Sequence, residues 1–322
     1  MLIDKVFENN WKDDFKINFT IPTYNRIENL ILIIKNFNKF TNQDFGIIIL
    51  DNKSSDFDFT IITNLLNNSK FGSKIYINKK HIGPDANVLR SMQLAVSEWV
   101  FLTGDSKILR PDTVEISLKN INQFSNLSSI VYSFDEVSLK SQVLNSLENF
   151  FKSKIKFGDL FLGGNSIVKK SSFDQFLAVA SQLTLSRSML TIFHILNLNN
   201  NNNVLFSSTK VIEKFISKPE KKYNPGFSLL ECWAQFPLLT TLEIGQKNQF
   251  YLNKFILKNE SRANYYNFIK YCLIQIIREK NKISTYLKKI INYRYVHYPY
   301  SIEKFFIYPL YFLSIIYEKI YD

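Results

Sequence analysis

Short apolar runs and helix-spaced apolar residues alternate over roughly the first third of the chain. Residues 16–21 (K-I-N-F-T-I), 45–50, 74–77 and 99–102 are mostly apolar or β-prone, which is typical of buried strands. Each of the first three runs is followed by a polar loop and then by apolar residues spaced three and four apart, as in amphipathic helices. This order predicts an α/β fold with a doubly wound, mostly parallel sheet, whose first strand stops at Pro22.

Polar segments follow each of these predicted strands. They read T-Y-N-R at 23–26, D-N-K-S-S-D at 51–56, N-K-K-H-I-G-P-D-A-N at 78–87 and D-S-K at 105–107. Ligands bind beyond the carboxyl ends of strands in open α/β sheets, so we expect these segments to converge on one rim. Taken alone, Asp105 would be assigned as a capping residue in a strand-to-helix turn. Its place in this series makes it a candidate for chemistry.

Composition and charge narrow the class of protein. A hydrophobic fraction of 46% and an aromatic fraction of 15% over 322 residues indicate a folded chain. The two cysteines, Cys232 and Cys272, and three separated histidines form no disulfide framework and no zinc-binding spacing, which fits a reducing cytoplasm. The net charge is +12, of which +7 falls in residues 251–322. A basic, aromatic-rich tail favours a membrane surface, a nucleic acid or an anionic substrate, but no nucleic-acid recognition motif is present.

The carboxy-terminal part of the chain differs from the rest. We predict an α/β domain at 1–226 and a helical, basic and aromatic region at 227–322. Mixed charges in the first twenty residues argue against a secretory signal, and no uncharged apolar run reaches the length of a membrane span. Residues 302–321 are very apolar, with Lys304 and Lys319 at the edges, as in interfacial helices. Packing against the α/β domain or against a second subunit in a homo-oligomer is an equal alternative.

The polar segments carry a family resemblance. I-P-T-Y-N-R, D-N-K-S-S-D, N-x-x-H-I-G-P-D-A-N and the strand ending in G-D together resemble a family 2 glycosyltransferase with the GT-A nucleotide-sugar fold. The subgroup most similar in pattern contains bacterial abequosyltransferase-like enzymes of surface polysaccharides. The resemblance covers roughly residues 16–112 and continues weakly at G-G-N-S-I-V-K-K (163–170), similar to the family's acceptor-side strand. It implies transfer of one sugar from a nucleotide-sugar donor to a lipid-linked glycan, at the inner face of the cytoplasmic membrane.

The same resemblance implies a donor-binding set. The first loop would lie against the nucleotide with Arg26 near phosphate, and Asp51 would accept a hydrogen bond from base or ribose or cap a helix. Asp56 would be structural. The full set of implied donor-binding residues is Thr23, Tyr24, Asn25, Arg26, Asp51, Asn52, Gly83, Asp85, Asn87 and Asp105.

Asp105 would be the first carboxylate of the family's D-x-D element, which holds Mg²⁺ or Mn²⁺ on the donor diphosphate. This chain has D-S-K, with Lys107 where a chelating carboxylate is expected. Three interpretations stay open. Lys107 could replace the metal as a fixed cation, Asp105 could hold the metal alone, or the chain could be a non-catalytic binding or scaffold protein with a degenerate site.

The general base is not identified by the pattern. The segment S-R-S-M-L-T-I-F-H (186–194), where the family often has an acidic pair, contains no acid. His194 is the titratable candidate there, alongside Asp105 and Lys107 as catalytic candidates, but a lone histidine on an apolar helix is more often a core residue. Glu231, and Asp135 with Glu136 after the strand at 130–134, are alternative bases.

Overall fold

The computed structural model describes residues 3–133, 140–153, 155, 165–177 and 186–216, and residues 309, 312, 313 and 315. The chain divides into two compact units, Met1–Pro219 and Glu220–Asp322. Nearly all described residues belong to the first unit. The helical region predicted at 227–322 lies outside the described residues, apart from the four positions near its end. No helix in the described part of the chain is long and apolar enough to cross a membrane.

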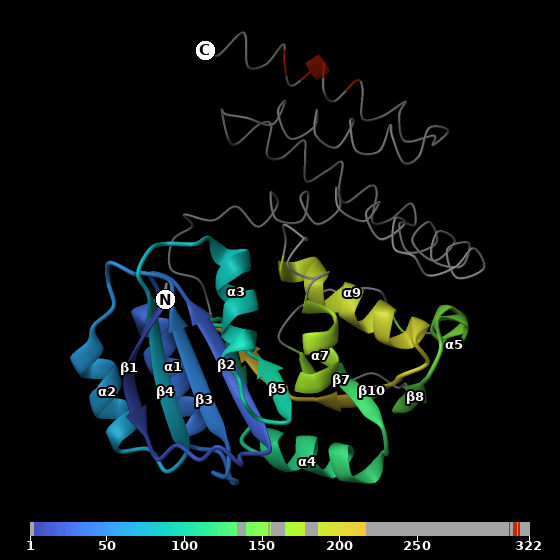
Figure 1. The fold of residues 1–322 in the computed structure, drawn as a ribbon, viewed down its shortest axis with the longest axis horizontal. Helices are drawn as coiled ribbons and strands as arrows, with labels where there is room; N and C mark the ends of the chain where they lie inside the picture. The colour runs from blue at the N-terminus through green and yellow to red at the C-terminus, as the bar shows by residue number, and fades with distance from the viewer. Residues whose placement is uncertain are drawn as a thin grey trace. The chain divides into compact units, whose positions relative to one another are not determined.

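A nine-stranded sheet in the order β1-β4-β3-β2-β5-β9-β7-β10-β8 forms the framework of the first unit (Figure 1). Strands β4, β3, β2 and β5 are parallel neighbours at its centre, and β10 runs parallel to β7. Strands β1, β9 and β8 join in antiparallel orientation, and β6 pairs with β11 in a separate ribbon. The strands are β1 Ile3–Asn9, β2 Ile17–Thr23, β3 Gly46–Asp51, β4 Gly72–Asn78, β5 Trp99–Leu102, β6 Lys107–Leu109, β7 Leu127–Ser133, β8 Gln142–Leu144, β9 Ser166–Lys169, β10 Asn203–Lys210 and β11 Ile212–Phe215.

Helices cover both faces of this sheet. Side chains of α1, α2 and α4 pack into one core and those of α3, α7 and α9 into another. Strand β3 shows why, because Ile47 and Ile49 enter the first core while Ile48 enters the second, as the alternation of a strand requires. The predicted α/β class with a mostly parallel, doubly wound sheet is confirmed. The helices are α1 Ile27–Phe37, α2 Phe59–Asn67, α3 Pro84–Gln93, α4 Thr113–Gln123, α5 Leu147–Lys152, α7 Lys170–Gln175 and α9 Ser186–Asn199.

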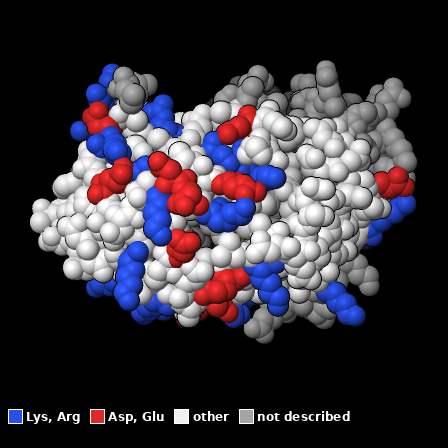
Figure 2. All heavy atoms as spheres, turned by 60° about the horizontal axis from the view of Figure 1, so that its bottom comes forward, with Lys and Arg blue, Asp and Glu red and all other residues white. Residues whose placement is uncertain are grey.

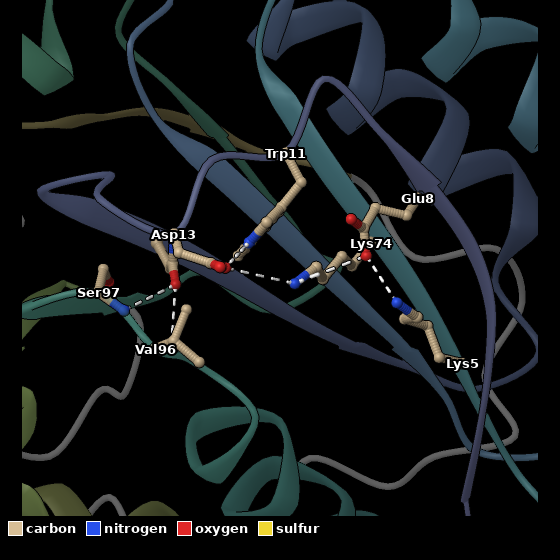
Figure 3. A network of polar contacts seen from close by, with 8 residues as sticks. Lys5, Glu8, Trp11, Asp13, Lys74, Val96 and Ser97 are labelled. Carbon is tan, nitrogen blue, oxygen red and sulfur yellow. Dashed lines mark hydrogen bonds and ion pairs between the residues drawn. The ribbon is translucent and has the colours of Figure 1, made fainter.

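Strand β1 was not among the strands that the sequence pattern predicted. It pairs with β4 at the sheet edge, and most of its side chains are exposed or half-buried, so it has no apolar periodicity. Polar contacts next to it involve Lys74 of β4, whose Nζ lies 4.1 Å from the centroid of the Trp11 ring (Figure 3). The same Nζ is 3.6 Å from Glu8 and 3.9 Å from Asp13. A cation over an indole and between carboxylates stabilises this edge.

The prediction that the first strand stops at Pro22 was wrong. Strand β2 continues through Pro22 to Thr23, and Pro22 is opposite Leu50 of β3. On its other side β2 pairs with β5 only as far as Thr20. Since Pro22 lies beyond that last pair, its missing N–H breaks no bond of that ladder.

Two local features differ from a simple interpretation of the sequence. The Asn-rich run at 197–203 is a loop only in part, because α9 extends to Asn199 and β10 begins at Asn203. Asn197 is buried, and its Nδ2 donates to the carbonyl of Phe193 at 2.8 Å. The N-cap of α2 is Asp58, which accepts from the N–H of Ile61, rather than a residue of the D-N-K-S-S-D segment.

Charged side chains of both signs lie next to one another on the face shown in Figure 2. Ion pairs between exposed side chains of the described residues include Lys12–Asp44 at 3.3 Å and Arg110–Asp112 at 2.7 Å. Exposed pairs contribute only about 0–1 kcal/mol each, so they matter more for surface charge than for stability. The basic excess of the chain is therefore not concentrated on this face.

Candidate functional site

Asp105 is held by three residues: one ends β2, and the other two lie in the loop and the helix that follow it. Its Oδ2 accepts from Thr23 Oγ1 at 3.1 Å, and its Oδ1 accepts from Arg26 Nη1 at 2.6 Å. Asn29 Nδ2 donates to its main-chain carbonyl at 3.0 Å. Asp105 follows β5 and Thr23 ends β2, so the parallel pairing of these strands brings the two together. Both the carboxylate and the backbone of Asp105 thus have fixed orientations.

This donor set does not fit a divalent cation well. Mg²⁺ and Mn²⁺ prefer several oxygen ligands, with carboxylates foremost. Here the Asp105 carboxylate holds an arginine and a hydroxyl, and its side chain is 11% exposed. No group of three or more His, Cys, Asp or Glu side chains suited to a metal occurs among the described residues. Lys107, two residues after Asp105 in the chain, is the first residue of β6 and is buried.

Asp51 ends β3 and lies beside Thr23, its partner in the strand register. Its carboxylate accepts from the N–H of Ser54 at 2.9 Å and from the hydroxyl of Ser54. Burial raises the pKa of Asp51 above its ordinary value, and the hydrogen bonds from Ser54 oppose that shift. A raised folded-state pKa means that ionisation of Asp51 makes the fold less stable as pH rises through that pKa. Asp51 and Asp105 therefore both lie next to Thr23, at the carboxyl ends of the parallel strands.

Hydrogen bonds join the loop after β2 to the loop after β3. Asn25 has a positive φ of 50°, its N–H donates to Ser54 Oγ at 2.8 Å, and its Oδ1 accepts from the N–H of Ser55 at 2.9 Å. Asp56 accepts from the N–H of Ile27, the first residue of α1, at 3.3 Å. Tyr24 keeps 43% of its surface exposed. These contacts hold the first loop in place and leave one aromatic ring accessible.

That exposed ring has a neighbour from a third loop. The centroids of the Tyr24 and His81 rings are 4.5 Å apart, with an angle of 55° between the planes. His81 follows β4 and is itself exposed. The two rings form a small aromatic surface on the rim, of the kind on which a planar base could stack.

Three buried asparagines connect the ends of β3 and β4 to α3. Asn78 Nδ2 donates to the Oδ1 atoms of Asn52 at 3.2 Å and Asn87 at 2.8 Å, and Asn78 Oδ1 accepts from Arg90 Nη1 at 3.3 Å. Asn52 Nδ2 donates to the carbonyl of Gly83 at 3.1 Å. Asn87 Nδ2 donates to the carbonyl of Leu50 at 3.2 Å. This amide network positions the loop that carries the G-P-D-A-N segment.

Glycines lie at two of the strand ends. Gly83 has a φ of 84° and Gly104 a φ of 67°, a backbone region that other residues adopt at a cost. A Cβ built on either glycine would meet no heavy atom of the described structure within 4 Å. Open space therefore lies in front of both, where the backbone can approach a ligand closely. Asp85 is in the first turn of α3, where the helix dipole stabilises a negative charge.

His194 is not at this rim, and the core interpretation of this residue is the better one. It lies on α9 with no exposed surface, and its ring nitrogens contact Ser129 Oγ at 3.0 Å and Ser166 Oγ at 3.3 Å. Burial lowers the pKa of His194 to about 3. A general base must be accessible to the acceptor, so we do not assign that role to His194. The alternative candidates Asp135, Glu136 and Glu231 lie outside the described residues.

Some residues of the site were missed by sequence reasoning. Ser54 and Asn78 lie within the segments quoted for the resemblance, but their polar partners depend on tertiary contacts. Asn29 and Arg90 lie on helices, where polar residues are usually solvated. Arg90 follows Asn87 by one helical turn, which is the one signal that placed it near the network.

Comparison with known proteins gives a family match for part of the chain. Residues 19–176 match the family described as glycosyl transferase family 2. The chain is 38% identical to abequosyltransferase RfbV of Salmonella typhimurium over 103 residues. This aligned segment covers 31% of each protein. Over 141 residues it is 28% identical to an uncharacterized glycosyltransferase of Rickettsia felis, which is 44% of this chain and 23% of that one. The matches thus span less than a third of the length of these relatives.

Solved structures share the fold. TarS 1-349 of S. aureus in complex with UDP-GlcNAc superposes with a TM-score of 0.62 at 13% identity, covering 94% of this chain and 88% of that one. The mannosyltransferase PcManGT of Pyrobaculum calidifontis in complex with GDP-Man and Mn²⁺ has a TM-score of 0.55 at 10% identity, covering 94% and 86%. At such identities the likeness concerns the fold alone, which is the GT-A fold of glycosyltransferases.

Residues 19–176 therefore match glycosyl transferase family 2, and the chain has the GT-A fold of glycosyltransferases. Within that family it resembles abequosyltransferase-like enzymes.

Proposed function

We propose that this protein is a glycosyltransferase that moves one sugar from a nucleotide-sugar donor to a glycan acceptor. The observation that carries the proposal is the convergence of Thr23, Arg26, Asp51 and Asp105 on one edge of the sheet. An anionic donor needs a cation for its diphosphate and a surface for its base. This end of the sheet offers Arg26 as the cation, held by Asp105, and the Tyr24 ring as a surface for the base.

The roles follow from the exposure of each group. The nucleoside would lie on Tyr24, and the diphosphate would lie near Arg26, in the open space before Gly83 and Gly104. Asp51 is buried and accepts from Ser54, so it would hold the loop after β3. Asn25, Asn52 and Asn87 have their side chains engaged in the loop contacts, so they would act by holding the loops. Asp85 would face the donor from α3. The proposal names no general base.

The acceptor in this proposal is a lipid-linked precursor of a bacterial surface glycan, such as lipopolysaccharide or capsule. Two observations support it: the similarity to an abequosyltransferase and the basic, aromatic-rich tail at 251–322. A positive, apolar tail suits an anionic membrane surface. The protein would then act at the inner face of the cytoplasmic membrane.

Donor binding tests the proposal directly. The full chain is titrated with UDP-, GDP-, CDP- and dTDP-sugars, and unfolding temperature and binding heat are measured. We expect one nucleotide class to bind, and a ligand at a hundred times its dissociation constant stabilises the fold by about 2.7 kcal/mol. D51N should weaken binding, whereas K35Q, on the exposed surface of α1, should not. Binding without release of nucleoside diphosphate in the presence of glycolipid extract would favour a non-catalytic role, and no binding at all would refute the proposal.

A further inference from the structure

The ion pair between Arg26 and Asp105 joins two residues that the sequence alone assigned to different tasks. Arg26 Nη1 donates to Asp105 Oδ1 at 2.6 Å, and Thr23 Oγ1 donates to the other carboxylate oxygen at 3.1 Å. The Asp105 side chain is 11% exposed and that of Arg26 is 30% exposed. The carboxylate is thus turned into the protein, and the guanidinium is the member of the pair that meets solvent.

A carboxylate placed in this way orients its partner. Guanidinium has five N–H donors in a rigid plane, and a bond from one edge to a fixed carboxylate sets the direction of the others. Thr23 donates to the carboxylate of Asp105, and Asn29 donates to its main-chain carbonyl. Asp105 therefore has little freedom to turn toward a cation. An ion that took both oxygens of Asp105 would have to displace Arg26 and Thr23.

The formal charges of these residues also argue against a bound divalent cation. Over Arg26, Lys107 and Asp105 the formal charge is +1. With aspartate at position 107 the same three positions would carry −1, and a divalent cation would be needed to return the value to +1. Lysine at 107 thus gives these three positions the same formal charge that an aspartate and a bound divalent metal would give them together.

From these contacts and charges we infer that the donor diphosphate is neutralised by the chain's own cations, with Arg26 as the contact and Asp105 as a positioning residue. Donor binding then needs no divalent metal. This inference rests on the proposed donor site, and it specifies how that site treats phosphate. Bidentate donation from arginine to phosphate oxygens is the interaction involved.

The first test compares nucleoside diphosphates with the corresponding nucleosides by calorimetry on the full chain, in EDTA and in Mn²⁺. UDP, GDP, CDP and dTDP are the probes. We expect the best diphosphate to bind in EDTA within about threefold of its affinity in Mn²⁺. R26Q should weaken diphosphate binding by about tenfold to a hundredfold and leave nucleoside binding within twofold, because a charge-assisted bond is lost. K35Q, which removes one charge from the exposed surface of the same helix, should change neither.

Two further variants separate a positioning residue from a metal ligand. D105N keeps an oxygen that can accept from Arg26 and removes a negative charge beside the phosphates, so in EDTA it should bind diphosphate at least as tightly as the native chain. K107D should bind weakly in EDTA and recover in Mn²⁺. Melting curves of each variant show that it is folded, and D105N and K107D decide the question should R26Q not fold.

The outcomes distinguish this inference from the function on which it rests. If the native chain loses diphosphate binding in EDTA and regains it in Mn²⁺, or if D105N abolishes binding, the inference is overturned and the donor site remains. If no nucleoside diphosphate binds under either condition, both are overturned.

Discussion

At the scale of single residues, burial decides which titratable groups are available for chemistry. His194 and Asp51 are both buried, but burial lowers the pKa of the histidine to about 3 and raises that of the carboxyl group. In each case the charged form is the one that is disfavoured. His194 lies between the hydroxyls of Ser129 and Ser166, so its neutral ring joins α9 to β7 and β9.

Burial of His194 predicts a pH dependence of stability. The ordinary pKa of 6.5 applies to the unfolded chain and about 3 to the folded one, so between these values the unfolded chain binds more protons. The free energy of unfolding should therefore fall as pH falls below about 6.5, by up to about 1.4 kcal/mol per pH unit from this residue. Urea unfolding between pH 7.5 and 5 should give a flatter profile for H194Q than for the native chain.

The matched control for that measurement is H81Q, because His81 is an exposed histidine on the rim. Its profile should follow that of the native chain. Equal slopes for H194Q and the native chain would show that His194 takes up its proton in the folded state.

At the scale of elements, the loops after β2, β3 and β4 are connected by side-chain amides rather than by apolar packing. Asn52, Asn78 and Asn87 are each buried and hydrogen-bonded to one another or to main-chain carbonyls. A buried polar group that loses its partner is destabilising, so such a network permits few arrangements. It specifies where the loop with Gly83 lies relative to the strand ends.

Removing the central member of this network should be costly. N78A removes the donor to Asn87 Oδ1 and the acceptor of Arg90, and leaves Asn52 Oδ1 with the N–H of Ile82 as its donor. We expect a loss of about 1–3 kcal/mol of unfolding free energy, together with weaker donor binding, since the Gly83 loop is released. Chemical denaturation measures the first and calorimetry the second. N67A, at the exposed end of α2, is the control, and an equal loss in both variants would argue against a specific network.

At the scale of the whole molecule, charge is distributed unevenly along the chain. The net charge is +12, with +7 in residues 251–322. The described unit pairs many of its charges at the surface, as with Lys12 and Asp44. The basic excess of the tail is therefore the main source of long-range attraction to an anionic surface.

This asymmetry predicts salt-sensitive membrane binding. The full chain should sediment with liposomes containing anionic lipid at low ionic strength and be released as salt is added, because the Debye length falls from about 30 Å at 0.01 M to about 8 Å at 0.15 M. K304Q/K319Q should bind more weakly, since each basic residue near the surface contributes about 1 kcal/mol. Neutral liposomes are the control. A native chain that stays in the supernatant at low salt would refute membrane contact.

The sequence by itself determined the parallel strands at the centre of the sheet and the polar segments at their ends. Strands β3 and β5 are buried on both faces, so their apolar runs are almost continuous and visible in isolation. Strand β2 is buried throughout although polar residues alternate with its apolar ones. Strand β1 escaped notice because it is an edge strand with polar side chains. Strand β9 was expected only from the family resemblance, and its antiparallel place between β5 and β7 depends on distant partners.

Only the tertiary structure decided what the polar residues do. Arg26 and Asp105 are 79 residues apart in sequence, and their ion pair exists because β2 and β5 are neighbours. His194 was a candidate base by its position in sequence, and packing against β7 and β9 made it a core residue. Local patterns report which residues are polar and where strands end. Partners come from long-range packing, and partners set both the charge a group carries and the direction in which it points.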